Sequence, residues 1–295
     1  MIMTIFKALF ETMRPKQWIK NLLVFAGLIF SLKLFEISAL VRSVGAFFIF
    51  CVVSGCVYIM NDMADIKRDL AHPEKCKRPI PSGRLPVRIA LLSLVVLALL
   101  AFVSGFLLSV EFGIITLVYF TVNIAYSFKL KNIVIIDVMI IAFGFVLRAA
   151  AGAVVINVTF SHWLLMCTML LALFLAICKR RHELYLIKEK PGKHRLVLQH
   201  YTPALIDQMT SVVTASALMA YALYTISPEV TDKLQTDKLI YTFPFVLFAI
   251  FRYLYLVMTQ NQGGSPEKVF LQDKAMIIDM FLWIVAVFAI LYFKL

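Results

Sequence analysis

The sequence predicts an all-α, polytopic membrane protein, a helical bundle with about nine transmembrane helices. Of its 295 residues, 62% are hydrophobic and 16% are charged, and the mean hydropathy is +0.89. A soluble domain is about half apolar and about a quarter charged, so this chain has more apolar surface than it can bury within itself. Apolar stretches close to the length of a bilayer span lie at 21–35, 38–60, 89–109, 112–128, 133–156, 160–178, 205–227, 239–260 and 275–294.

The N-terminal segment 1–20 is predicted to lie at the membrane surface. Charged residues interrupt any apolar core that a cleaved signal would need, whereas apolar residues recur at helical spacing: Ile2, Phe6, Leu9, Phe10 and Met13. The first span, 21–35, is short and contains Lys33. We therefore expect this helix to be tilted or to end early.

The basic residues orient the chain. With the N-terminus inside, the predicted inner segments contain 22 of the 29 Lys and Arg residues and the outer segments contain 5, while Arg148 and Arg252 lie within spans. This asymmetry predicts a cytoplasmic N-terminus and, with nine spans, an external C-terminus in a bacterial-type inner (cell) membrane. The longest polar segments, 61–88 and 179–204, are then cytoplasmic active-site loops of a single domain, 1–295.

The net charge of +12 indicates which partners to expect. In a membrane protein this excess favours anionic membrane lipids and phosphorylated substrates, and no nucleic acid. The five cysteines and five histidines show no metal-ligand spacing, so the cysteines are expected to be free thiols packed as small apolar residues. A homo-oligomer is compatible with the sequence.

The acidic segment 61–69 is the most informative part of the chain. Asp62, Asp65 and Asp69 stand at i, i+3 and i+7, so on a continuing helix they line one face. Carboxylates crowded at the end of an apolar span repel one another unless a cation lies among them. Oxygen ligands suit Mg²⁺, which fills its coordination shell with water and substrate phosphate. The segment therefore predicts a metal site, to which Asn61 adds a neutral oxygen.

The alternative interpretation is a solvated helix end in which Lys67 and Arg68 pair with the carboxylates. The loop that follows favours the metal site. Prolines and a glycine in 79–83 stiffen the return of the chain, and three basic residues precede them: Lys75, Lys77 and Arg78. Carboxylates, a metal and adjacent cations together can bind a diphosphate.

At these residues the sequence resembles the UbiA superfamily of intramembrane transferases. The similar stretches are 61–69, the return 77–83 and Tyr126–Lys129 at the end of the fourth span. The resemblance implies a nine-helix bundle with a central cavity that opens sideways to lipid, and Mg²⁺-dependent cleavage of a diphosphate.

One departure from the superfamily pattern concerns the loop after the sixth span. Aromatic prenyltransferases of the superfamily carry a second aspartate-rich motif there, whereas this chain reads Cys178-Lys179-Arg180-Arg181-His182-Glu183. The basic run resembles the polyprenyl-phosphate phosphoribosyltransferase branch. Other segments similar to that branch are 14–21, 144–149, 179–184 and 263–267.

Further charged residues are candidates for substrate binding. Lys16 and Lys20 flank Trp18, and they are either interfacial anchors or phosphate ligands. Lys129 and Lys131, one turn after Tyr126, fit the positive-inside rule equally well. Lys179 and Glu183 are four residues apart and could simply pair on a surface. Arg180, next to Lys179, is a further candidate. Arg252, Asp273 and Lys274 in the last two spans repeat the pattern of charge at the inner rim of the cavity, with Asp273 as a hydroxyl acceptor for a sugar.

Asp137 and Arg148 lie in the fifth span, eleven residues apart. This is close to three helical turns, so both project from one face. A buried arginine in a span needs a partner or an anion, so we expect this face to line the cavity. A structural ion pair with another helix is the alternative.

The leading functional hypothesis follows from the resemblance. It is Mg²⁺-dependent transfer of 5-phosphoribose from phosphoribosyl diphosphate to a polyprenyl (decaprenyl-like) phosphate, which releases diphosphate and supplies a cell-envelope polysaccharide precursor. Asp62, Asp65 and Asp69 would hold the metal, with Lys179 and Glu183 also in the catalytic set. One alternative is an ordinary prenyltransferase that moves a prenyl group from prenyl diphosphate to an aromatic or lipid acceptor. A second is a transporter that uses Asp137 and Arg148.

Overall fold

A computed structural model describes residues 2–72, 74–159, 161–189, 196–260, 264 and 266–294. Throughout these residues the regular secondary structure is helical, which confirms the predicted all-α class. The chain forms two compact units. Unit 1 comprises Met1–Lys131 and Leu147–Thr159, and unit 2 comprises Asn132–Val146 and Phe160–Leu295. The assignment of 1–295 to one transferase domain stays a prediction.

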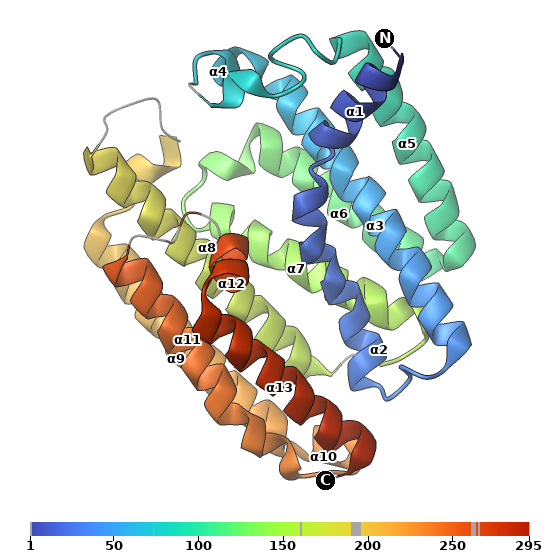
Figure 1. The fold of residues 1–295 in the computed structure, drawn as a ribbon, viewed down its shortest axis with the longest axis vertical. Coiled ribbons are helices and arrows are strands. Elements are labelled where there is room, and N and C mark those ends of the chain that lie inside the picture. Colours follow the sequence, from blue (N-terminus) through green and yellow to red (C-terminus); the bar gives the residue numbers. More distant parts are fainter. Residues whose placement is uncertain are drawn as a thin grey trace. The chain divides into compact units, whose positions relative to one another are not determined.

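The helices follow one another with short connections (Figure 1). Unit 1 and the connection that ends it contain α1 (Ile2–Thr12), η1 (Pro15–Phe25), α2 (Ala26–Phe30), α3 (Ile37–Ala64), α4 (Ile66–Leu70), η2 (Lys75–Lys77), α5 (Val87–Leu108), α6 (Val110–Phe128) and η3 (Leu130–Asn132). The next helix, α7 (Ile136–Val155), belongs partly to each unit. Unit 2 continues with α8 (His162–Glu189), η4 (Leu196–His200), α9 (Pro203–Ile226), α10 (Pro228–Leu234), η5 (Lys238–Thr242), α11 (Phe243–Thr259), α12 (Pro266–Gln272) and α13 (Lys274–Phe293).

Eight helical segments in the described part of the chain are long and apolar enough to cross a membrane: α3, α5, α6, α7, α8, α9, η5 with α11, and α13. They match eight of the nine predicted spans, and the protein is a multi-pass membrane protein. The count of nine is not confirmed, because the predicted span 21–35 is no continuous α-helix. There the chain forms the 3₁₀ helix η1 and then the short α2, and Leu32 has a φ of 60°. This helix ends early, as Lys33 suggested.

The segment before α3 nevertheless runs along the whole of α3 in the opposite direction (Figure 1). Arg14 binds Asp62 near the C-terminal end of α3, and Asn21 donates to Ser54 one-third of the way back, at 3.2 Å. Glu36 is the N-cap of α3 at the other end. A helix of 28 residues is about 40 Å long. Residues 14 and 36 therefore lie at opposite ends of a helix that is long enough to cross a bilayer.

Unit 1 is held together by close packing of η1, α3, α6 and the second half of α7. Phe50 makes edge-to-face contacts with Phe112 and Tyr119, with ring centroids 6.0 and 5.2 Å apart. A Cβ atom at Gly152 would lie 1.8 Å from the carbonyl oxygen of Val24, so only glycine allows α7 to approach η1 this closely. This packing places buried polar residues of α7 and η1 in contact.

Unit 2 has two apolar clusters. In the first, Tyr253 of α11 stacks on Phe270 of α12 at 5.7 Å and contacts Phe174 of α8 at 5.4 Å. The second packs the start of α7 against α8 and α9 through buried residues that include Val138, Ile177 and Ile206. The second cluster surrounds the charged residues of α7 and α8 described below.

Candidate functional site

The acidic segment does not form one continuous helix. α3 ends at Ala64, and Asp65, with φ −100° and ψ 11°, separates it from α4. The expectation that all three aspartates line one helix face is therefore wrong, because that spacing argument requires an unbroken helix. Asp62 and Asp69 are each 2% exposed, whereas the side chain of Asp65 is 30% exposed.

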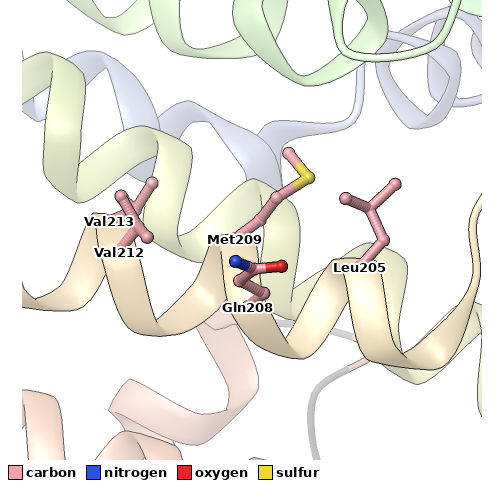
Figure 2. Close-up of a pocket in the computed structure, with 5 residues that line it drawn as sticks. All are labelled: Leu205, Gln208, Met209, Val212 and Val213. Atoms are coloured by element: carbon pink, nitrogen blue, oxygen red, sulfur yellow. The ribbon is translucent and has the colours of Figure 1, made fainter.

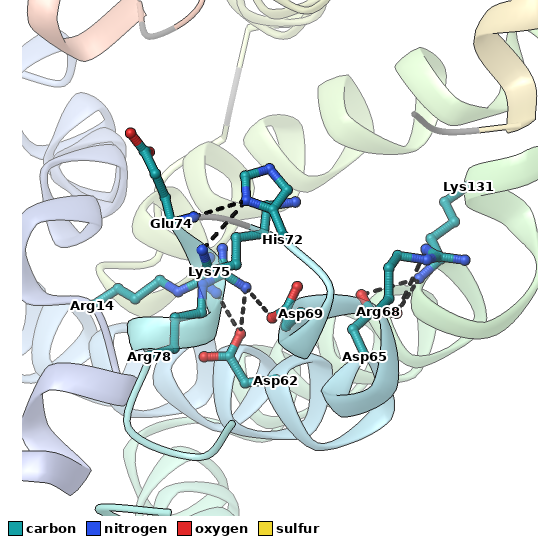
Figure 3. Close-up of polar contacts among 10 residues, drawn as sticks. All are labelled: Arg14, Asp62, Asp65, Arg68, Asp69, His72, Glu74, Lys75, Arg78 and Lys131. Carbon is teal, nitrogen blue, oxygen red and sulfur yellow. Dashed lines mark hydrogen bonds and ion pairs between the residues drawn. The ribbon is translucent and has the colours of Figure 1, made fainter. Parts of the chain in front are cut away.

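The two buried carboxylates converge on arginine side chains of unit 1 (Figure 3). Nη1 of Arg78 donates to Oδ1 of Asp62 at 3.1 Å and to Oδ2 of Asp69 at 2.7 Å. Arg14 also donates to Oδ1 of Asp62, and its guanidinium lies 4.8 Å from the ring centroid of Tyr58. Two guanidinium groups thus balance two buried carboxylates, as burial of charge requires.

Asp65 has different partners. Nζ of Lys131 lies 3.3 Å from Oδ1 of Asp65, and Arg68 lies 3.6 Å from the same oxygen (Figure 3). Lys67 is exposed on α4. For Asp65 the arrangement resembles the solvated helix end, with Arg68 as the expected surface partner.

The return loop after α4 is shaped by a histidine and an arginine. Nδ1 of His72 accepts hydrogen bonds from the backbone N–H groups of Glu74 and Lys75, at 3.2 and 3.4 Å (Figure 3). Arg84 forms two hydrogen bonds with Glu11 of α1, at 2.8 and 2.9 Å, and this donation lowers the pKa of Glu11 from its ordinary value. Both contacts fix the loop that carries Arg78.

The donor set can be compared with the needs of a divalent cation. Among the described residues, no group of three or more His, Cys, Asp and Glu side chains converges as a metal site. Mg²⁺, however, commonly uses one or two carboxylates and completes its octahedron with water and phosphate. Asp62 and Asp69, which already share one cationic nitrogen, fit that requirement, and Asn61 immediately precedes Asp62 on α3. Asp65 is not brought to this pair.

Arg148 lies in a second buried polar group of unit 1. Its Nε donates to Oδ1 of Asn21 at 2.8 Å and its Nη2 donates to the hydroxyl of Tyr119 at 2.7 Å. Asn21 in turn donates to the hydroxyl of Ser54. Asn21 and Tyr119 were not among the site residues predicted from the sequence. The available signal was the occurrence of polar side chains within otherwise apolar segments.

Asp137 belongs to a buried network in unit 2. Its Oδ2 accepts from Nε of Arg180 at 2.6 Å, and its Oδ1 accepts from the hydroxyl of Tyr201 at 2.8 Å. Nη1 of Arg180 donates to Glu183 at 2.7 Å. Asp137 therefore forms a structural ion pair with another helix, which was the alternative interpretation of this residue. Tyr201 was missed by the sequence analysis.

Arg252 and Asp273 form a bidentate pair in unit 2, at 3.2 and 2.8 Å. Asp273 is also the N-cap of α13, where it accepts from Met276 N–H at 2.9 Å. Donation from Arg252 lowers the pKa of Asp273 from its ordinary value. The carboxylate assigned to a sugar hydroxyl thus has a structural role already. Lys274 is exposed beside it.

The remaining predicted residues lie on η1, at the end of α6 and within α8. Lys16 is exposed and Lys20 half-buried on η1, Tyr126 is half-buried and Lys129 exposed at the end of α6, and Lys179 is half-buried on α8. Of the predicted loop 179–204, residues 190–195 lie outside the described residues. Of the similar segment 263–267, residues 263 and 265 also lie outside them.

A shallow groove runs along α9 (Figure 2). It has a volume of about 360 Å³, and its lining contains Leu205, Gln208, Met209, Val212 and Val213. No predicted site residue belongs to this lining. Apart from Gln208, the residues of this lining are apolar.

The fold and these charged groups define a class: a multi-pass helical membrane protein whose ionic side chains gather at helix ends. The chain belongs to the UbiA prenyltransferase family, which matches residues 22–285. It is similar to the decaprenyl-phosphate phosphoribosyltransferase of Mycolicibacterium smegmatis, with 31% identity over 97% of this chain and 93% of the relative. It is also similar to the protein of that name in Corynebacterium glutamicum, with 32% identity over 96% of this chain and 86% of the relative.

Solved structures show the same fold. A UbiA homolog from Archaeoglobus fulgidus bound to GPP and Mg²⁺ has a TM-score of 0.72 at 18% identity, covering 96% of this chain and 99% of that chain. A digeranylgeranylglyceryl phosphate synthase has a TM-score of 0.67 at 18% identity, with 96% and 98% covered. The protein is therefore an enzyme, a transferase of the UbiA family. The transporter alternative is set aside.

Proposed function

We propose that the protein transfers 5-phosphoribose from phosphoribosyl diphosphate to a polyprenyl phosphate, with release of diphosphate. The observation that carries the proposal is the similarity to two decaprenyl-phosphate phosphoribosyltransferases over nearly the whole chain. The sequence 178–183 agrees with it, because it is basic where aromatic prenyltransferases of the superfamily have a second aspartate motif. The product would serve as a precursor of a cell-envelope polysaccharide.

Asp62 and Asp69 are the proposed metal ligands, with Asn61 next to Asp62 in the sequence and with Asp65 as a peripheral carboxylate. When bound there, Mg²⁺ would supply charge neutralisation for the leaving diphosphate. Arg78 currently donates to both ligands. Once the carboxylates bind a metal, this guanidinium can donate to phosphate oxygens instead, for which its planar fork is well suited.

The reaction breaks the bond between ribose C1 and the diphosphate oxygen and forms a bond between C1 and a lipid phosphate oxygen. C1 becomes oxocarbenium-like as the first bond breaks. A phosphate monoester is ionised near neutral pH, so the acceptor needs no strong base. We assign Lys179 and Glu183 to binding of the donor. Four further lysines would bind phosphate groups near the membrane surface: Lys16, Lys20, Lys129 and Lys131.

The proposed topology places the N-terminus and the segments 61–88 and 179–204 in the cytoplasm and the C-terminus outside. It is supported by the distribution of Lys and Arg. It is also supported by the course of residues 14–36 along α3, which would make this segment the first of nine crossings.

A prenyl diphosphate donor is the second candidate. The acidic segment of unit 1 favours it equally, because this segment would suit any donor with a diphosphate leaving group. In addition, a structural neighbour is bound to GPP and Mg²⁺. That neighbour is 18% identical, so its likeness supports the fold alone.

The test supplies membranes that contain the protein with Mg²⁺, polyprenyl phosphate and either ribose-labelled phosphoribosyl diphosphate or labelled prenyl diphosphate. We expect ribose label in the lipid fraction, no incorporation in EDTA, and none with Asp62→Asn. Prenyl label in an acceptor, without ribose label in lipid, would replace the proposal by the second candidate.

A further inference from the structure

A strained turn precedes α7. The backbone N–H of Ile136 donates to the carbonyl of Val134 at 2.8 Å, and Ile135 between them has a φ of 69°. A three-residue turn with this hydrogen bond and positive φ is a rare, strained γ-turn. A β-branched residue in that region is an outlier. Such strain persists only where the surrounding structure determines the conformation.

Tyr201 is the side chain that holds this turn. Its hydroxyl accepts from the backbone N–H of Ile135 at 2.8 Å and donates to Oδ1 of Asp137 at 2.8 Å. Tyr201 is 4% exposed. Burial raises its pKa to about 12, so the hydroxyl remains a hydrogen-bond donor at neutral pH.

The network continues from Asp137 to Arg180 and Glu183 of α8. Asp137 is 0% exposed and accepts from Arg180, which is 1% exposed. Arg180 donates onward to Glu183, whose side chain is 24% exposed. Lys179 and Glu183 are four residues apart and so lie on the same side of α8. The position of Arg180 therefore determines how α8 presents both of these candidate site residues.

These features are costly for stability. A buried ion pair is often no more stable than well-packed apolar residues of the same size, and a strained turn adds a further cost. In this part of unit 2 both occur together with a buried hydroxyl that connects them. Their common effect is a defined geometry at residues 179–183 of α8.

We propose that Tyr201 is a positioning residue for the phosphorylated donor: through Asp137 it fixes Arg180, and thereby Glu183 and the neighbouring Lys179. The inference rests on the proposed function in assigning Lys179 and Glu183 to the donor. Tyr201 itself contacts no substrate in this scheme.

The test is Tyr201→Phe, which keeps the ring and removes both hydrogen bonds of the hydroxyl. Misplacement of binding groups by about 1 Å can cost up to about a hundredfold in rate. We expect the apparent KM for the donor to rise about tenfold or more, while the apparent KM for the lipid acceptor is unchanged. Tyr241→Phe is the matched control, because Tyr241 is 71% exposed, and it should change neither value.

A second variant separates positioning from stability. Ile135→Gly removes the strain of positive φ, so the double variant Tyr201→Phe/Ile135→Gly should recover part of the thermal midpoint lost in Tyr201→Phe. Its donor KM should remain high. Recovery of both the midpoint and the donor KM would overturn the proposal. Equal changes in the donor KM and the acceptor KM in Tyr201→Phe would also overturn it.

Failure of the proposed function would be recognised separately. All variants are assayed with the donor that the wild-type enzyme uses in the labelling experiment. If that donor is a prenyl diphosphate, the phosphoribosyl assignment fails. A selective rise in the KM for that donor would still support Tyr201 as a positioning residue, and an unchanged KM would overturn it.

Discussion

Nη1 of Arg78 lies 2.7 Å from Oδ2 of Asp69, and the same nitrogen donates to Asp62 at 3.1 Å. A single positive group therefore lies between two buried carboxylates, where a divalent cation would find its ligands. A metal bound by Asp62 and Asp69 would compete with Arg78 for these oxygens. The displaced guanidinium would then be available to the diphosphate, so that binding of the metal and binding of the donor would be coupled.

This competition predicts opposite effects of Arg78→Gln on two ligands. Removal of the competing charge should tighten binding of Mn²⁺, used as a probe for Mg²⁺, by about tenfold, equivalent to about 1.4 kcal/mol. Loss of the guanidinium should weaken binding of the donor by about ten- to a hundredfold, because charge-assisted hydrogen bonds to phosphate are stronger than neutral ones. Electron paramagnetic resonance of Mn²⁺ on the purified protein measures the first effect, and donor KM the second.

Arg88→Gln is the control for Arg78→Gln. Arg88 is the second residue of α5, ten residues after Arg78, and its side chain is exposed. This substitution should change neither the affinity for Mn²⁺ nor the donor KM. If Arg78→Gln weakens both Mn²⁺ and the donor, or leaves both unchanged, the competition does not exist.

The carboxylates should differ in importance. Asp62→Asn removes a charge from the buried pair and should lower kcat by about a hundred- to a thousandfold, since loss of one contact to developing charge commonly costs about 3–4 kcal/mol. Asp65→Asn should have a smaller effect, because Asp65 is directed to Lys131. Turnover is also measured in excess EDTA. Glu36→Gln is the control, because the side chain of Glu36 is 51% exposed. Full activity in EDTA would exclude a metal-dependent reaction.

The course of residues 14–36 can be tested by cysteine accessibility. Lys7→Cys in α1 and Lys33→Cys before α3 lie on either side of this segment. If the segment crosses the membrane, a membrane-impermeant thiol reagent should label Lys33→Cys from outside and Lys7→Cys only after permeabilisation. Labelling of both from one side would reduce the number of crossings to eight.

Arg42 should stabilise unit 1 without affecting substrates. Its Nε donates to the carbonyl of Val155 at 2.6 Å and its Nη2 to that of Leu108 at 2.9 Å. These are the last residues of α7 and α5, whose terminal carbonyls lack helical partners and attract cations. Arg42→Met should reduce the free energy of unfolding by about 1–3 kcal/mol and leave both KM values unchanged. Arg88→Met, at an exposed position at the start of α5, should alter neither.

The spans were predictable because a bilayer demands about twenty apolar residues, a local property of the sequence. The site was predictable only as a set of charged positions. The arrangement of the aspartates was missed because helical spacing assumes an unbroken helix, whereas Asp65 interrupts it. Partners such as Arg14 for Asp62 and Tyr201 for Asp137 are 48 and 64 residues away. No local pattern predicts such a choice, and Ile135 in a γ-turn contradicts its own propensity.

The final prediction concerns donor recognition by the basic run of α8. Lys179 is half-buried and one residue before the anchored Arg180. If the run replaces a second metal site, its cations bind the donor directly by charge-assisted hydrogen bonds. Lys179→Ala should then weaken binding of phosphoribosyl diphosphate by at least about tenfold. Binding of polyprenyl phosphate should change little, because its chain is held by apolar helices. Two titrations, each varying one substrate, measure this difference.

Lys179→Arg and Lys238→Ala are the controls for that comparison. The first keeps the charge and should restore part of the donor affinity, although the two cations differ in geometry. The second removes a lysine from η5, away from the basic run in sequence, and should change neither titration. If Lys179→Ala changes both substrate affinities equally, or neither, the basic run acts only as a topology signal. The prenyl diphosphate donor would then become the better explanation, because the reason for assigning the cations of α8 to a phosphorylated sugar would be gone.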